Sequence, residues 1–99
     1  MKAIAISPTY NEKRNIKELI NRVLASYPGI EILIIDDNSP DGTATIVKKL
    51  MKQDDKIHIL ERTAKLGLGT AYCFGFKWAL DNGYDRIIQI DADMSHNPN

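Results

Sequence analysis

The sequence contains a single cysteine, no net charge and no long apolar run, and each absence excludes a class of protein. Cys73 is alone among 99 residues, so an intrachain disulfide is excluded and a reducing compartment is expected. Lys and Arg residues (13) balance Asp and Glu residues (13), and without a basic run we expect no binding to nucleic acid. No apolar stretch approaches the roughly 18 residues that span a bilayer, and residues 1–6 lack a signal-peptide core. We therefore expect a cytoplasmic protein, with any membrane contact peripheral and supplied by the full-length protein.

A glycine-rich phosphate turn is missing where a dinucleotide-binding fold would carry one. Residues 8–12 (PTYNE) follow the first apolar run and contain no glycine, which excludes a nicotinamide dehydrogenase. Residues 65–71 (KLGLGTA) contain one G-x-G before a helical pattern. Two interpretations stay open for this segment: backbone contact with a phosphate, or the entry to a helix with a basic neighbour.

Four short apolar runs alternate with three helical patterns along the chain. The apolar runs cover residues 3–7, 30–36, 56–61 and 86–91, and the helical patterns cover residues 16–24, 43–53 and 69–81. The unbroken apolar block at residues 32–35 favours a strand that is covered on both faces. This alternation predicts one α/β domain over residues 1–99, a parallel doubly wound βαβαβαβ sheet with strand order 3-2-1-4. On the third helix we expect four residues to face the sheet: Ala71, Phe74, Trp78 and Ala79.

The chain stops a few residues beyond its fourth predicted strand, on the polar residues 91–99. A natural domain seldom ends on a loop rich in functional side chains, so we expect a domain that is truncated at its C-terminus. The fourth strand would then be an open edge through which the chain could self-associate.

Two aspartates follow the fourth apolar run, at the end of the sheet where open α/β folds bind their ligands. Residues two apart in an extended segment point to the same side, so Asp91 and Asp93 can converge on one ion. Hard carboxylate oxygens suit Mg²⁺ or Mn²⁺, which would be shared with substrate phosphates. The alternative is a solvated turn. We predict that Asp91 and Asp93 are metal ligands.

Four further acids and an aromatic ring lie where the first two strands end. Only one of Asp36 and Asp37 can point into a cleft, because neighbours in a strand alternate faces. We assign Asp37 to ligand binding, as an acceptor for a base N–H, and Asp41 to the structure of a turn. Tyr10 offers a ring for stacking and Glu12 a carboxylate for ribose hydroxyls. The alternatives are an exposed loop residue and an acid in the first turn of a helix.

Four segments form an ordered series over nearly the whole chain: residues 8–12, residues 35–43 (IDDNSPDGT), Arg62 with residues 65–71, and residues 91–96 (DADMSH). This series closely resembles family 2 glycosyltransferases of the GT-A fold, and specifically the dolichyl- or polyprenyl-phosphate mannosyltransferases. The DNSPDGT and DADxSH parts are the most specific.

The resemblance implies an inverting, metal-dependent transfer of mannose from GDP-mannose to a polyprenyl or dolichyl phosphate. It implies binding of the nucleotide sugar by a set of eight residues: Pro8, Tyr10, Glu12, Ile35, Asp37, Asp91, Ala92 and Asp93. Asp91 and Asp93 would hold Mg²⁺ or Mn²⁺. The acceptor phosphate is already anionic, so a strong general base is less necessary.

In this family the basic residues that grip the phosphates and the acceptor region would follow residue 99. We therefore expect weak binding of nucleotide and metal without turnover, and we assign no catalytic residue on the acceptor side. A UDP-sugar donor and a non-catalytic α/β nucleotide-binding or assembly module remain as alternatives. A phospho-receiver is disfavoured because no lysine follows Lys77.

Overall fold

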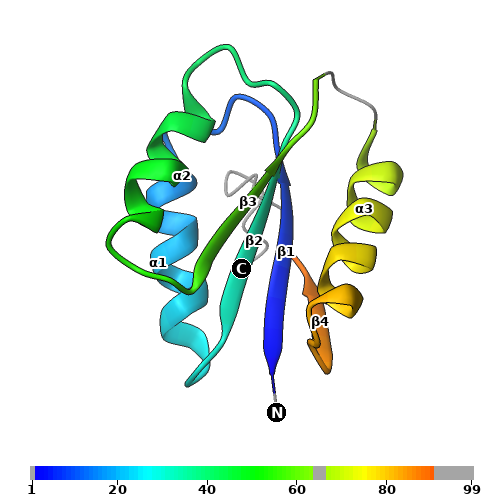
Figure 1. Cartoon of the computed structure of the whole chain (residues 1–99). Coiled ribbons are helices and arrows are strands. Elements are labelled where there is room, and N and C mark those ends of the chain that lie inside the picture. The colour runs from blue at the N-terminus through cyan, green and yellow to red at the C-terminus, as the bar shows by residue number, and fades with distance from the viewer. Residues whose placement is uncertain (1, 64–66, 91–99) are drawn as a thin grey trace, which may run out of the picture.

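Three layers make up the fold, with one parallel sheet between helices on both of its faces (Figure 1). The computed structural model describes residues 2–63 and 67–90. In chain order the elements are β1 (Ala3–Thr9), α1 (Ile16–Ser26), β2 (Glu31–Asp36), α2 (Thr43–Met51), β3 (Ile57–Glu61), α3 (Leu68–Asp81) and β4 (Arg86–Gln89). Helices α1 and α2 cover one face, and α3 covers the other.

The strand order is β3-β2-β1-β4 and every pairing is parallel, which confirms the predicted fold class. Strand β1 runs to Thr9 rather than Ser7, because Pro8 and Thr9 still pair with Ile35 and Asp36 of β2. Strand β4 is described to Gln89, and the predicted strand end at Asp91 lies outside the described residues.

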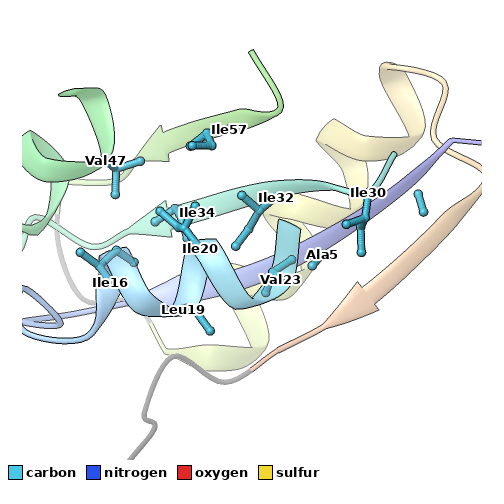
Figure 2. Packing of buried hydrophobic residues seen from close by; sticks show 11 residues of the cluster. Ala5, Ile16, Leu19, Ile20, Val23, Ile30, Ile32, Ile34, Val47 and Ile57 are labelled. Carbon is cyan, nitrogen blue, oxygen red and sulfur yellow. The ribbon is translucent and has the colours of Figure 1, made fainter. Parts of the chain in front are cut away.

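The alternation of side chains along the central strands gives each face of the sheet its own core. Ala5, Ile32 and Ile34 lie under α1 and α2, and Figure 2 shows Ile20 of α1 packed against Ile34. The opposite face presents residues Ile4, Ile6, Leu33 and Ile35 to α3. Burial of an isoleucine side chain contributes about 1.5–3 kcal/mol. Two buried faces explain why residues 32–35 are apolar without a break.

Helix α3 packs on the sheet through small residues rather than through Phe74. The prediction that Phe74 faces the sheet is wrong, because its side chain is 47% exposed. Residues four apart share a helix face, and the buried series is Ala71, Gly75 and Ala79. The backbone approaches closely there: a Cβ at Gly75 would lie 2.8 Å from Ile6 Cγ2.

Helix ends depart slightly from the predicted positions. Helix α1 begins at Ile16 as predicted and ends at Ser26, beyond its apolar pattern, and the side chain of Asn15 makes no capping hydrogen bond. Helix α2 follows Gly42, which has a φ of 93° that favours glycine, and it ends at Met51 rather than Gln53. None of the described helices combines the length and the apolar character that a bilayer crossing needs.

Candidate functional site

The carboxyl ends of the parallel strands form one rim of the sheet, and the loops that follow β1 and β2 lie side by side there (Figure 1). Strands β1 and β2 are neighbours, so the β1–α1 loop (residues 10–15) lies beside the β2–α2 loop (residues 37–42). Ligands of open α/β sheets bind at this end. The rim is therefore the candidate site, as the sequence predicts.

Side chains at the start of α2 and in the β2–α2 loop hold the β1–α1 loop. Backbone N–H groups of residues 11, 12 and 13 donate to Ser39 Oγ at 2.9 Å, Thr43 Oγ1 at 3.0 Å and Asp41 Oδ2 at 3.0 Å, respectively. Asp41 Oδ1 also accepts the backbone N–H of Thr43 at 3.0 Å and its hydroxyl at 2.5 Å. Burial raises the pKa of Asp41, but the bonds from Thr43 and Lys13 outweigh burial and lower it below its usual value.

Asp36 has a structural role on the face covered by α1 and α2. It is 1% exposed and accepts the hydroxyl of Thr9 at 2.7 Å. Its carboxylate also accepts the Ser39 hydroxyl at 2.6 Å and the Ser39 N–H at 3.0 Å. These bonds leave Asp36 directed into the protein, which agrees with the expectation that only one of the two adjacent aspartates serves a cleft.

Asp37 points to the other face and is paired with Arg62. Arg62 Nε donates to Asp37 Oδ1 at 2.6 Å, and Nη2 donates to Oδ2 at 2.8 Å. Both side chains are 7% exposed, so this bidentate pair is nearly removed from water. The hydrogen bond to Asp37 raises the pKa of Arg62 against the effect of burial. A guanidinium in this geometry fixes the plane of the carboxylate.

Arg62 also connects Asp37 to the start of α3. Its Nη1 donates to Thr70 Oγ1 at 3.0 Å, and its Nη2 donates to the carbonyl of Gly67 at 3.3 Å. Beside this contact lies a shallow open depression lined by Arg62, Gly69, Thr70, Cys73 and Phe74. Lys65 and Leu66 of the KLGLGTA segment lie outside the described residues, so phosphate contact by that segment stays a prediction.

The structure brings the predicted nucleoside-binding residues of the first two strands to one place. Pro8 pairs with Ile35 in register, and Tyr10 and Asp37 each follow their strand at the same rim. Tyr10 is 38% exposed, which leaves part of its ring accessible for stacking. Ile35 is fully buried under α3, so any contact it makes with a ligand comes from its backbone. Glu12 is half-buried in the β1–α1 loop.

The predicted metal ligands, Asp91 and Asp93, lie outside the described residues together with Ala92. The residue before them, Ile90, donates its N–H to the carbonyl of Ile6 at 2.9 Å, so the described chain continues beside β1 in the direction of the rim. Within residues 2–63 and 67–90, no group of three or more His, Cys, Asp or Glu side chains forms a metal site. The metal site thus stays a prediction for Asp91 and Asp93.

Three residues matter at this rim more than the sequence alone indicates. The sequence presents Arg62 only as part of a motif, although the predicted neighbourhood of strands 3 and 2 is a signal that could pair it with Asp37. The register of β2 and β3 pairs Glu61 with Asp36, so the next residues, Arg62 and Asp37, lie beside each other. Ser39 and Thr43 give no such signal, because their partners lie in another loop, 28 and 31 positions away.

A second polar cluster lies at the opposite end of the sheet and has a structural character. Glu31 accepts hydrogen bonds from Tyr84 and from His58, both at 2.6 Å, and Trp78 packs against both rings. Burial raises the pKa of Glu31, but the bonds from Tyr84 and His58 outweigh it and lower the pKa. Burial and the bond to Glu31 raise the pKa of Tyr84. The cluster joins β2 and β3 to the end of α3, away from the rim.

Comparison with known proteins places these features in a family. The sequence profile of glycosyl transferase family 2 matches residues 4–99. Polyprenol monophosphomannose synthase of Mycolicibacterium smegmatis is 44% identical over 98 residues, which are 98% of this chain and 37% of that protein. Undecaprenyl-phosphate mannosyltransferase of Micrococcus luteus is 42% identical over 98 residues, which are 99% of this chain and 40% of that protein.

Solved structures share the fold. The mannosyltransferase PcManGT of Pyrobaculum calidifontis, in complex with GDP-Man and Mn²⁺, has a TM-score of 0.77 at 26% identity, over 93% of this chain and 27% of that chain. TarS 1-349 of S. aureus in complex with UDP has a TM-score of 0.68 at 28% identity, over 94% of this chain and 28% of that chain. The chain thus spans less than half the length of the proteins it matches. The profile match over nearly every residue, together with the strand order of a GT-A nucleotide-binding half, shows that the chain belongs to glycosyl transferase family 2.

Proposed function

We propose that the chain is the donor-binding part of an inverting glycosyltransferase that moves a mannosyl residue from GDP-mannose to a polyprenyl phosphate. The observation that carries the proposal is identity above 40%, over nearly the whole chain, to a polyprenol monophosphomannose synthase and an undecaprenyl-phosphate mannosyltransferase. The fold supports a donor site at the rim, because Tyr10 leaves part of its ring accessible there and Arg62 fixes the carboxylate of Asp37.

Asp37 is the residue that we propose to recognise the nucleobase. Arg62 holds both of its oxygens, and a carboxylate oxygen has a second acceptor site for an N–H donor. Guanine offers two adjacent N–H donors, which suits the two oxygens of one carboxylate. Tyr10 would stack on the base, and Glu12 would accept hydrogen bonds from the ribose. Pro8 and Ile35 would line the same pocket at the ends of their strands.

A divalent cation completes the proposed donor site. Asp91 and Asp93 would hold Mg²⁺ or Mn²⁺ through hard carboxylate oxygens, which are the ligands these ions prefer. When bound, such a cation stabilises the negative charge of a departing diphosphate. Ala92, between the two acids, would adjoin the sugar diphosphate. Support comes from the bond of Ile90 to Ile6, which directs the chain toward the rim, and from the Mn²⁺ in the PcManGT complex.

The residues of this chain bind and orient the donor, and we propose that they do not complete the reaction. The chain spans 37% and 40% of the two relatives, so more than half of each relative lies outside the matched region. An acceptor phosphate is already anionic and needs no strong base from the donor side. The isolated 99 residues should therefore bind donor without transferring the sugar.

Calorimetric titration of the complete gene product with GDP-mannose, with and without Mn²⁺, tests the proposal together with a transfer assay onto a polyprenyl phosphate. Asp37→Asn should weaken donor binding by at least about tenfold, or 1.4 kcal/mol. Asp55→Asn, which changes an exposed acid between α2 and β3, is the matched control and should bind normally. Loss of transfer in Asp91→Asn and Asp93→Asn is expected. Full transfer activity in both would refute their role as metal ligands, and absence of transfer by the unsubstituted protein would support a non-catalytic module.

A UDP-sugar donor is the second candidate, and the similarity to TarS in complex with UDP favours it. Uracil offers one N–H donor flanked by two carbonyl acceptors, so the donors of Arg62 would then matter as much as Asp37. Titration with UDP-glucose beside GDP-mannose separates the candidates. Binding of UDP-glucose with no response to GDP-mannose would replace the guanine proposal, and binding of neither would end both.

A further inference from the structure

Three consecutive amides of the β1–α1 loop are satisfied by side chains that come from beyond the end of β2. Residues 11, 12 and 13 donate to Ser39, Thr43 and Asp41 at 2.9–3.0 Å. Tyr10 and Glu12, which we propose to contact the nucleoside, belong to this same loop. Its first residues are therefore held from outside the loop, in addition to the turn in which the Glu12 carbonyl accepts the N–H groups of Asn15 and Ile16.

The loop includes a backbone conformation that needs such support. Asn11 has a φ of 56°, in the left-handed region that few residues other than glycine adopt. Asparagine tolerates this region better than most side chains. A backbone held there persists when the surrounding structure determines it. The bond from the N–H of Asn11 to Ser39 Oγ acts at that residue.

The three supporting side chains are themselves fixed. Ser39 Oγ donates to the buried carboxylate of Asp36 at 2.6 Å. Thr43 is fully buried, and its hydroxyl donates to Asp41 while it accepts the N–H of Glu12. A hydroxyl that donates to a carboxylate has its lone pairs directed elsewhere, so it is oriented as an acceptor. The arrangement has the form of a rigid support for a binding loop.

We propose that Ser39, Asp41 and Thr43 are positioning residues for donor binding, because they hold the β1–α1 loop in the conformation that presents Tyr10 and Glu12. The inference rests on the proposed function, since it assigns these residues to the same donor site. It gives Ser39, Asp41 and Thr43 of the DNSPDGT segment a role that differs from contact with the ligand, because their side chains act on the neighbouring loop.

Amide hydrogen exchange, measured by NMR on the complete gene product, tests the support directly. Ser39→Ala should speed exchange at the amide of Asn11, and Thr43→Val should speed exchange at the amide of Glu12, each by about tenfold. Thr43→Ser keeps the hydroxyl and should preserve protection. Thr45→Val changes an exposed threonine in the same helix and is the matched control. Unchanged exchange at both amides would overturn the proposal.

Donor titration of the same variants tests the functional part. Thr43→Val should raise the Kd and the KM for the donor about fivefold to tenfold with little change in kcat, and Thr43→Ser should restore both. A merely structural role would lower the amount of folded protein without this split. Normal donor affinity in Thr43→Val and Ser39→Ala, with their amides exchanging faster, overturns the positioning role alone. Absence of donor binding in the unsubstituted protein overturns the proposed function, and the exchange pattern still reports on the loop.

Discussion

Replacement of Arg62 by methionine should destabilise the protein by about 3–5 kcal/mol, because it leaves the Asp37 carboxylate buried without its partner. Both side chains are 7% exposed, so water cannot readily take the place of the guanidinium. The substitution also removes the hydrogen bonds to Thr70 Oγ1 and to the carbonyl of Gly67. Methionine retains most of the aliphatic volume of arginine, which keeps the loss of packing small.

A double-mutant cycle separates the ion pair from the other effects of the substitution. Asp37→Asn alone should cost less than Arg62→Met, because Arg62 keeps its bonds to Thr70 and Gly67. The double variant should lose less than the sum of the single losses, with a coupling energy of about 1–3 kcal/mol. Urea unfolding at constant m-value gives the required free energies.

The exposed ion pair between Arg22 and Glu18 provides the control. Their side chains are 63% and 58% exposed, and such pairs contribute about 0–1 kcal/mol. Arg22→Met should therefore change the free energy of unfolding by less than about 1 kcal/mol. If Arg62→Met were as mild as Arg22→Met, or if the two losses at Asp37 and Arg62 were additive, the pair would not hold the rim as we describe.

Three further predictions concern packing, a buried hydroxyl and acid stability. Gly75→Ala should destabilise the protein relative to Gly69→Ala by about 1–3 kcal/mol in urea unfolding, because a Cβ at Gly75 meets Ile6 at 2.8 Å whereas one at Gly69 meets nothing within 4 Å. Equal effects would contradict the close contact of α3. Ser7 Oγ is buried and has no hydrogen-bond partner among the described residues, so Ser7→Ala should leave the melting temperature unchanged or raise it, and a fall would reveal a partner. The lowered pKa of Asp41 makes its stabilisation complete above the unfolded value near 3.9 and lost as pH falls through the folded pKa. Unfolding measured between pH 7 and pH 2 should therefore show a smaller acid loss in Asp41→Asn, and an unchanged acid profile would refute the assignment.

The sheet could be predicted from the sequence because its rules are local. An unbroken apolar block at residues 32–35 indicates a strand covered on both faces, and the alternation with helical patterns limits the strand order. Helix α3 shows where such rules stop. Phe74 is larger and more apolar than the neighbouring Gly75, and helical spacing allows it to face the sheet. The close approach of backbone at Gly75 decides the orientation, and that depends on Ile6, far away in the sequence.

The site could be predicted only in its location. Composition identifies residues 38–42 as a turn, but a turn motif does not reveal that its side chains accept amides of another loop. The same limit applies to Arg62. An arginine after a strand is common, and its pairing with Asp37 follows from the register of β2 and β3. Hydrogen bonds between residues far apart in the sequence follow no fixed spacing, so a periodic pattern of residue types does not predict them.

The end of β2 explains why two acids stand side by side in this sequence. Strand alternation directs Asp36 to the face of α1 and α2, where Ser39 and the hydroxyl of Thr9 use its oxygens. It directs Asp37 to the opposite face, where Arg62 extends the contact to α3. Neither acid can replace the other, because exchanging their roles would require a shift of one residue in register. One strand end therefore supports the β1–α1 loop on one face and α3 on the other, and the rim is stable only while both carboxylates keep their partners.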